Sequence, residues 1–195
     1  MQYRLAQKNT HTVKIKGSKF IAICQPIRNR EEAKAAITDV EKEHHKANHV
    51  CWAYRVYEEN QILGYSSDAG EPHASAGPPI LAALEGRRLV NAVCVVVRYF
   101  GGTKLGIGGL IRAYGGTAAG ALDEAGLQPY DPPVLIRLAT DNAGYADLMR
   151  ILGKYQYHLD QSYRDNQILL EVRLPCEEVP SFHNDLQTIP QVQVL

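Results

Sequence analysis

The sequence predicts a mixed helix-and-sheet fold, α/β or α+β, in two domains at residues 1–130 and 131–195. Three observations indicate this organisation. Pro129, Pro132 and Pro133 lie close together, and such a cluster favours an extended connector over a helix or a central strand. The balance of charge changes sign at the same place. On either side, strand-like alternation and helix-like spacing follow one another along the chain.

In the second domain, the order of elements is short and regular. We expect strand Val134–Ala139, helix Asn142–Gly153, strand Tyr155–Tyr163, strand Ile168–Leu174, a helix from Pro175 to about Leu186 and strand Val192–Leu195. Asp165 and Asn166 are expected to form the tight turn between the second and third strands. This β-α-β-β-α-β order is typical of the ferredoxin-like fold. His158 and His183 have no obvious partner, so nothing here indicates catalysis.

The first domain is predicted to carry the chemistry. We expect strand His11–Cys24, helix Arg30–Lys46 capped by Asn29, strand His49–Tyr57, a turn-rich stretch Gly64–Gly77, a short helix Pro78–Leu84, strand Ala92–Tyr99 and helix Gly106–Ala125. The run AVCVVVRY in the last strand indicates burial on both faces, as in the centre of a sheet.

Composition excludes several classes of protein. The chain has 195 residues, of which 45% are hydrophobic and 22% charged, which is unlike a disordered or collagen-like chain. No stretch approaches the ~18 consecutive apolar residues of a membrane span. Met1–Lys19 carries charges and no apolar core, so we expect no secretory signal and a cytoplasmic location. Cys24, Cys51, Cys94 and Cys176 contain no C-x-x-C pair and are expected to be reduced thiols.

The formal net charge of +0 conceals an uneven distribution. Residues 1–130 hold 16 basic and 12 acidic groups, whereas residues 131–195 hold 5 and 9. Residues 1–30 contain seven basic residues and no acid, and residues 86–122 contain five and no acid. Neutrality therefore excludes an indiscriminate polycation but allows a local positive field on the first domain. The alternative is that these groups point in different directions and are merely solvated.

The first candidate site is the glycine-rich run from Arg98 to Arg112. Eight of the 16 glycines of the chain lie between Gly101 and Gly120, where the strand passes into the helix. Glycine lets a ligand approach the backbone, and a helix N-terminus attracts anions. The predicted anion or nucleic-acid contacts are Arg98, Gly101, Gly102, Lys104, Gly106, Gly108 and Arg112. The run is neither a Walker A loop nor a dinucleotide fingerprint. A packing role is the alternative for the helically spaced Gly109, Ala113, Gly116 and Gly120.

The second candidate site is the polar loop from Ser66 to Gly77. A hydrolase would use His73 as base, oriented by Asp68 or Glu71. Its nucleophile would be one of three serines, Ser66, Ser67 or Ser75. The alternative is a series of Asx and Ser turns that ends in a helix cap.

The third candidate site is the cluster of His44, His45, His49 and Cys51. Zinc needs three or four converging ligands, and the sequence offers no certain fourth one here. We therefore expect no metal and no cofactor.

The motifs of the first domain resemble those of the YigZ/IMPACT family. They are H-x-C-W-A (His49–Ala53), S-D-x-G-E-P (Ser67–Pro72) with A-G-x-P (Ala76–Pro79), and V-V-R-Y-x-G-G-x-x-L-G-x-G-G-L-x-x-A-Y-G (Val96–Gly115). The resemblance implies an α+β protein. Its N-terminal domain would have the β-α-β fold of a ribosomal-protein domain, and its ferredoxin-like C-terminal domain would resemble the last domain of elongation factor G.

The resemblance also bears on function. Eukaryotic relatives regulate translation and bind the co-activator of a kinase that acts on an initiation factor. The usual pattern resembles S-D-D-G-E-P-x-G-T-A-G, whereas this chain has Ala69, Ala74 and Ser75 at the second Asp, the Gly and the Thr. Losing that Asp weakens the case for paired carboxylates in acid–base or metal chemistry.

Our leading hypothesis is a non-enzymatic, cytoplasmic regulator of translation that binds RNA or the ribosome. Arg98, Lys104 and Arg112 would contact phosphate, while Tyr99 or Phe100 would stack on an exposed base. The alternatives are a peptide or phosphoester hydrolase using the polar loop, and a protein-interaction module whose basic surfaces meet an acidic partner. No membrane partner is expected.

Overall fold

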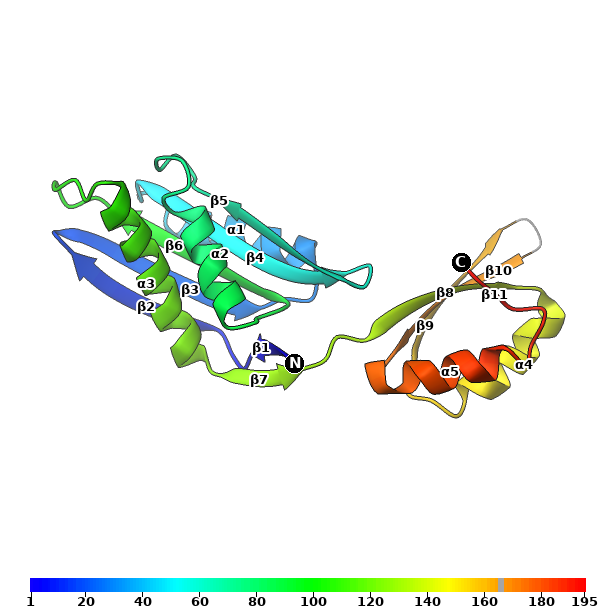
Figure 1. Cartoon of the computed structure of the whole chain (residues 1–195). Coiled ribbons are helices and arrows are strands. Elements are labelled where there is room, and N and C mark those ends of the chain that lie inside the picture. Colours follow the sequence, from blue (N-terminus) through cyan, green and yellow to red (C-terminus); the bar gives the residue numbers. More distant parts are fainter. Residues whose placement is uncertain (165–166) are drawn as a thin grey trace. The chain divides into compact units, whose positions relative to one another are not determined.

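The structure is a computed structural model that describes residues 1–164 and 167–195 (Figure 1). The chain divides into two compact units, Met1–Tyr130 and Asp131–Leu195. Each unit combines helices with an antiparallel sheet, which confirms the α+β class. The turn expected at Asp165 and Asn166 lies outside the described residues. Within the described ranges, none of the helices has both the length and the apolar character needed to cross a membrane.

The first unit is built on a five-stranded sheet. Its elements are β1 (Gln2–Leu5), β2 (Asn9–Ile15), β3 (Ser18–Pro26), α1 (Arg30–Glu43), β4 (His49–Glu58), β5 (Gln61–Ser67), α2 (Gly77–Gly86), β6 (Ala92–Tyr99), α3 (Ile107–Ala125) and β7 (Leu127–Tyr130). The sheet order is β2-β3-β6-β4-β5, and β1 pairs with β7 in a separate two-stranded ribbon. This order places β6 at the centre of the sheet, as its apolar sequence indicates.

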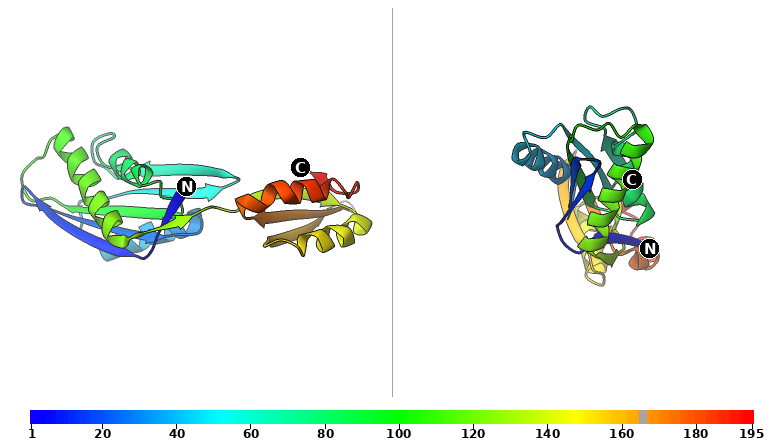
Figure 2. Two further views of the ribbon diagram at one scale, coloured as in Figure 1. Left: turned by 60° about the horizontal axis from the view of Figure 1, so that its bottom comes forward. Right: turned by 90° about the vertical axis from the view of Figure 1, so that its left-hand side faces the viewer.

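Helices cover both faces of this sheet. Figure 2 shows α1 on one side and α2 and α3 on the other. Two separate hydrophobic clusters fill the two interfaces. Because side chains alternate along a strand, β6 contributes to both: Val93, Val95 and Val97 join the cluster under α1. Ala92, Cys94 and Val96 join the cluster under α2 and α3.

Three segments of the first unit differ from expectation. The strand expected over His11–Cys24 is the hairpin β2–β3, because Lys16 and Gly17 take positive φ and reverse the chain. The expected turn-rich stretch from Gly64 instead continues as strand to Ser67, where backbone pairing with β4 holds a polar sequence extended. Strands β1 and β7 were not expected, since both are short and β7 contains a proline.

The second unit has the ferredoxin-like arrangement. Its elements are β8 (Val134–Thr140), α4 (Asn142–Leu152), β9 (His158–Arg164), β10 (Gln167–Leu174), a 3₁₀ turn (Cys176–Glu178), α5 (Val179–Leu186) and β11 (Gln193–Val194). The sheet order is β11-β8-β10-β9, with antiparallel neighbours, and Leu148, Leu170 and Phe182 lie in its core. Strand β9 begins later than Tyr155, because that ring packs on Phe182 and its hydroxyl donates to Asp185.

Candidate functional site

Arg98 is a charged residue on a face of β6 whose other side chains belong to the hydrophobic core. It follows Ala92, Cys94 and Val96 at every second position of β6, so it points toward α2 and α3. The residue is 5% exposed. A buried charge is costly unless it is paired and hydrogen-bonded, so this position of the strand requires an acidic partner.

Glu71 is that partner. Its Oε1 accepts hydrogen bonds of 2.7 Å from Arg98 Nη1 and 2.7 Å from the Tyr114 hydroxyl of α3. Only 3% of the Glu71 side chain and 7% of the Arg98 side chain are exposed. Burial raises the pKa of Tyr114 far above its ordinary value, so this phenol remains a neutral donor. The contacts tie β6, α3 and the β5–α2 loop (residues 68–76) together.

Two aromatic rings flank the guanidinium of Arg98. Its Cζ lies 5.5 Å from the centroid of Phe20 and 5.4 Å from that of Phe100. Cation–π contacts of this kind hold a guanidinium plane in place. Tyr99, the other ring considered for base stacking, instead has its hydroxyl 3.0 Å from His44 Nδ1.

Asp68 caps the start of α2. Its carboxylate accepts hydrogen bonds from the backbone amides of Ala74, Ala76 and Gly77. Burial raises the pKa of Asp68, but these three hydrogen bonds outweigh it and leave the pKa below its ordinary value of 3.8. The side chain therefore organises the β5–α2 loop as an ionised cap.

Replacing Asp68 by asparagine should lower the free energy of unfolding at pH 7 by about 1–3 kcal/mol, since both carboxylate oxygens accept hydrogen bonds and the asparagine NH2 group cannot accept one. Because the pKa of Asp68 is lower in the native state than in the unfolded chain, the ionised carboxylate stabilises the fold at pH values above the unfolded pKa. This stabilisation is lost as the pH falls through the native pKa. Urea unfolding at several pH values should therefore show the two proteins converging below about pH 4. Asp39→Asn, on the exposed side of α1, is the control. A constant difference between wild type and Asp68→Asn across this range would contradict the capping role.

The three residues of the hydrolase hypothesis do not form one catalytic group. Asp68 binds backbone amides, Glu71 is buried with Arg98 and Tyr114, and His73 is exposed. No hydrogen bond joins these three side chains among the described residues. Of the proposed nucleophiles, Ser75 is buried and donates to the Pro72 carbonyl, while the Ser67 hydroxyl accepts from the Ala69 amide. The loop is the series of turns and caps weighed as the alternative.

The histidine and cysteine cluster has separate partners as well. His44 contacts Tyr99, and Nδ1 of His45 and His49 lies by the carbonyls of Lys42 and Ala69, respectively. Cys51 donates to the carbonyl of Asp68, and burial raises the pKa of its thiol to about 12. In the part of the chain that the structure describes, no three His, Cys, Asp or Glu side chains are placed to hold a metal ion.

Gly101 marks a close approach between distant parts of the chain. A Cβ at Gly101 would lie 1.9 Å from the carbonyl carbon of Gly17, and one at Gly17 would lie 2.7 Å from the carbonyl oxygen of Gly101. The Gly101 amide also donates to the Ser18 hydroxyl. The glycine loop (residues 100–106) therefore rests directly on the tip of the β2–β3 hairpin.

The other predicted contact glycines have different roles. Gly102 and Gly106 have φ of +87° and +70°, a conformation that L side chains rarely adopt. Gly108 lies in the first turn of α3, where a Cβ would meet only the Arg112 guanidinium, at 3.6 Å. Positive φ explains why glycine occupies positions 102 and 106. At Gly108, the absence of a side chain leaves the backbone at the start of α3 uncovered.

The packing role expected for the helically spaced glycines of α3 holds only in part. Ala113 is buried, a Cβ at Gly120 would meet His11 at 2.7 Å, and one at Gly109 would meet Leu105 at 3.1 Å. Gly116 is exposed with no atom within 4 Å of such a Cβ, so the packing interpretation is wrong there. Residue 116 simply falls on the outer face of the helix.

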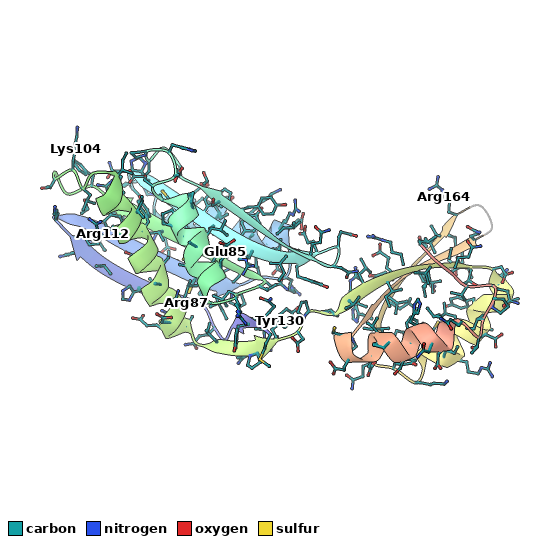
Figure 3. All side chains as sticks on the ribbon, in the orientation of Figure 1. Glu85, Arg87, Lys104, Arg112, Tyr130 and Arg164 are labelled. Carbon is teal, nitrogen blue, oxygen red and sulfur yellow. The ribbon has the colours of Figure 1, made fainter. Side chains whose placement is uncertain are left out.

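Five exposed cations are carried by the tip of the β2–β3 hairpin, the glycine loop and the second turn of α3. These residues, here called the basic end, are Lys14, Lys16, Lys19, Lys104 and Arg112. Alternation along β3 puts Lys14 and Lys19 on the side of the sheet that α1 covers, while Arg112 lies on the other side. Figure 3 shows Lys104 projecting from the loop and Arg112 from α3. Lys14 and Lys19 are direct cross-strand partners, an arrangement that is destabilising for like charges. Among the described residues, none of these five forms an ion pair with an acid.

A pocket of about 270 Å³ lies beside the basic end. Its lining includes Glu71, Arg98, Phe100, Lys104, Gly106 and Leu110. The pocket therefore joins the polar loop and the glycine loop, two motifs that the sequence presents as separate candidate sites. Arg98 lines the pocket rather than the open surface.

Comparison with known proteins identifies the family. Residues 16–122, more than half of the chain, match the Impact N-terminal domain. The chain belongs to the IMPACT family. It is 34% identical to the IMPACT family member YvyE of Bacillus subtilis over 92% of this chain and 82% of that protein. It is 36% identical to the IMPACT family member YigZ of Escherichia coli over 86% of this chain and 83% of that protein.

A solved structure extends the likeness to both units. A crystal structure described as that of a hypothetical protein matches this IMPACT protein with a TM-score of 0.76 and 33% identity, covering 100% of this chain and 96% of the other. The segment that matches the family domain includes the hairpin tip, the lining of the pocket and most of α3. Apart from Lys14, the candidate site thus lies within the family domain.

Two parts of the site were missed in the sequence. Tyr114 is the second donor to Glu71, and its position on the apolar face of α3 was the available signal, because a buried phenol needs a hydrogen-bond partner. Lys14, Lys16 and Lys19 were counted as basic residues, but nothing in their local pattern indicates that the hairpin they belong to contacts a loop 83 residues away, through Ser18 and Gly101.

Proposed function

We propose that this IMPACT family protein is a translation-related regulator whose first unit binds the phosphate backbone of RNA, on the ribosome or free. The observation that carries the proposal is the contact between Gly17 and Gly101. It brings the glycine loop, from the acid-free segment 86–122, against the hairpin tip, from the acid-free segment 1–30. The regulatory role in translation rests on membership in the family, whose eukaryotic relatives regulate translation.

The chemistry of the basic end suits a polyanion. Lysine and arginine side chains neutralise phosphates and release condensed counterions. The N-terminus of α3 adds backbone amides, because Gly106 at its cap has no side chain to accept their hydrogen bonds. Phe100 is 45% exposed beside these groups and presents a ring on which an unpaired base can stack. Cations, free amides and one aromatic ring together favour single-stranded or looped RNA.

The proposal predicts that removing two cations of the basic end weakens RNA binding. Lys104→Ala with Arg112→Ala should reduce affinity for a labelled structured RNA about tenfold or more at about 0.1 M salt, since hydrogen bonds to charged groups are lost. Fluorescence anisotropy of the full chain measures this effect.

The matched control removes the same charge elsewhere in the first unit. Lys34 lies in the N-terminal half of α1 and Arg88 follows α2, and both are exposed. Lys34→Ala with Arg88→Ala should leave the affinity within about twofold, because long-range interactions between exposed charges are screened by salt. Equal losses in the two double variants would contradict a directed site.

An acidic protein partner is the competing outcome. Capture of partners from a lysate, with and without nuclease, separates the two interpretations. Loss of the captured material after nuclease supports the RNA proposal, whereas a partner retained after nuclease and released by the Lys104 and Arg112 substitutions would replace it.

A further inference from the structure

The pocket beside the basic end contains polar groups whose hydrogen bonds are not satisfied within the chain. Arg98 Nη1 is taken by Glu71, but Arg98 Nε is buried and has no acceptor in the residues that the structure describes. The side chain is more than nine-tenths buried and lines the pocket. A buried donor without a partner is rare in folded proteins, and this one belongs to a side chain that lines the pocket.

The start of α3 supplies further donors on the same pocket. Gly106 and Ile107 both line it. The first turn of a helix has backbone amides without an intrahelical partner, and no side chain caps them here. Gly108, next in the turn, has no Cβ to cover them, and Lys104 stands at the rim. These donors all favour an anion with several acceptor oxygens.

The remaining wall of the pocket is apolar. Pro72, Leu105 and Leu110 contribute to it, and Phe100 and Ile107 are 45% and 59% exposed at its mouth. Exposed large apolar side chains next to a cationic site indicate a ligand that has a ring or another apolar part beside its charge.

The charge of the pocket is set by groups other than the Arg98–Glu71 pair. That pair is neutral as a whole, and Glu71 fixes the guanidinium through its 2.7 Å bond. The sign of the charge in the pocket is therefore determined by Lys104 and the positive end of the α3 dipole, and it is positive. The volume of about 270 Å³ is slightly below the about 300–1,000 Å³ typical of small-molecule sites, so it suits one small residue rather than a folded helix of RNA.

We propose that this pocket binds one nucleoside phosphate monoester, with the phosphate at Arg98, Lys104 and the start of α3 and the base against Phe100. A monoester carries close to two negative charges and three strong acceptor oxygens, more than a phosphodiester within a strand. The monoester is either the phosphorylated end of an RNA strand or a free nucleotide. If the ligand is the phosphorylated terminus of an RNA strand, the inference rests on the proposed function, because the basic end would hold the strand whose terminus enters the pocket.

The test compares RNA ends that differ by one phosphate. Affinities of the full chain are measured by anisotropy for one single-stranded RNA carrying an internal dye and ending in 5′-phosphate, 5′-hydroxyl or 3′-phosphate. Adenosine monophosphate, adenosine and inorganic phosphate are titrated separately by calorimetry. We expect about tenfold tighter binding of one phosphorylated end, or direct binding of adenosine monophosphate that exceeds that of adenosine by a similar factor.

The outcomes separate the two sources and the two proposals. An end preference identifies the RNA terminus as the ligand, and binding of the mononucleotide without end preference identifies the free nucleotide. RNA binding with neither effect overturns this inference and leaves the proposed function standing. Nucleotide binding without RNA binding overturns the proposed function and leaves this inference standing.

Substitutions at exposed positions locate the effect. Lys104→Ala should abolish the preference for the phosphorylated end, whereas Lys16→Ala should weaken both RNAs by the same factor. Phe100→Ala should reduce affinity about fivefold or more by removing base stacking. Ile111→Ala removes an apolar side chain that is 40% exposed on the next turn of α3 and should have no effect. A preference that survives Lys104→Ala would place the phosphate elsewhere.

Discussion

Replacing Glu71 by alanine is expected to lower the free energy of unfolding of the first unit by about 3–5 kcal/mol, the cost of leaving a buried charge unpaired. The substitution leaves Arg98 in the core without its 2.7 Å partner and Tyr114 without an acceptor. It also removes the contact that connects the β5–α2 loop to β6. Urea unfolding of the full chain, followed by the fluorescence of Trp52 in the first unit, measures the loss.

Two further variants test the cause of this loss. Replacing both Glu71 and Arg98 by methionine removes the unpaired charge and should be less destabilising than Glu71→Ala alone. Arg28→Ala breaks the ion pair between Arg28, which is 88% exposed, and Glu32, and it should cost far less stability than Glu71→Ala because exposed ion pairs contribute little. If Glu71→Ala cost no more than Arg28→Ala, the buried pair would not be a structural requirement of the site.

Replacing Gly101 by alanine should destabilise the first unit by about 3 kcal/mol, the upper end of the usual range for overpacking. The added Cβ would lie 1.9 Å from the Gly17 carbonyl carbon and 2.4 Å from the Ser18 amide nitrogen. Both are backbone atoms, so no side chain can move aside. The glycine loop and the hairpin tip must separate, and the affinity for RNA should fall together with the stability.

Gly116→Ala is the control, and it should change the free energy of unfolding in the opposite direction. A Cβ there meets no atom within 4 Å, and the residue lies within α3. Gly116→Ala should therefore raise the free energy of unfolding by about 0.5–1 kcal/mol. Thermal unfolding of the two variants beside the wild type gives the comparison. Stabilisation by both substitutions would show that the close approach at Gly101 does not constrain the fold.

Local patterns predicted most of the elements. Strand Ala92–Tyr99 was predicted with the bounds that the structure shows, because its apolar run is short and rich in β-branched valine. The second unit followed from alternation, spacing and turn residues alone. The hairpin at Lys16 and Gly17 was missed, since the strand pattern continues on both sides of the turn.

The candidate site was harder to predict, because its parts come from distant segments. Arg98 and Glu71 were assigned to two different sites, although they share a hydrogen bond across 27 positions. Alternation along β6 groups residue 98 with Ala92, Cys94 and Val96, but only the fold shows that this face lies under α3 and which acid lies opposite. Long-range contacts such as that between Gly17 and Gly101 leave no local pattern in the sequence.

The salt dependence of RNA binding tests the central claim most directly. The logarithm of the binding constant of the full chain for single-stranded RNA is measured against the logarithm of the salt concentration, for the wild type and for Lys104→Ala with Arg112→Ala. If each of the five cations of the basic end neutralises one phosphate, the wild-type slope should be about −3.5, and the double variant should reduce its magnitude by about 1.4. A wild-type slope near zero, or the same slope in both proteins, would contradict a phosphate-binding surface at the basic end.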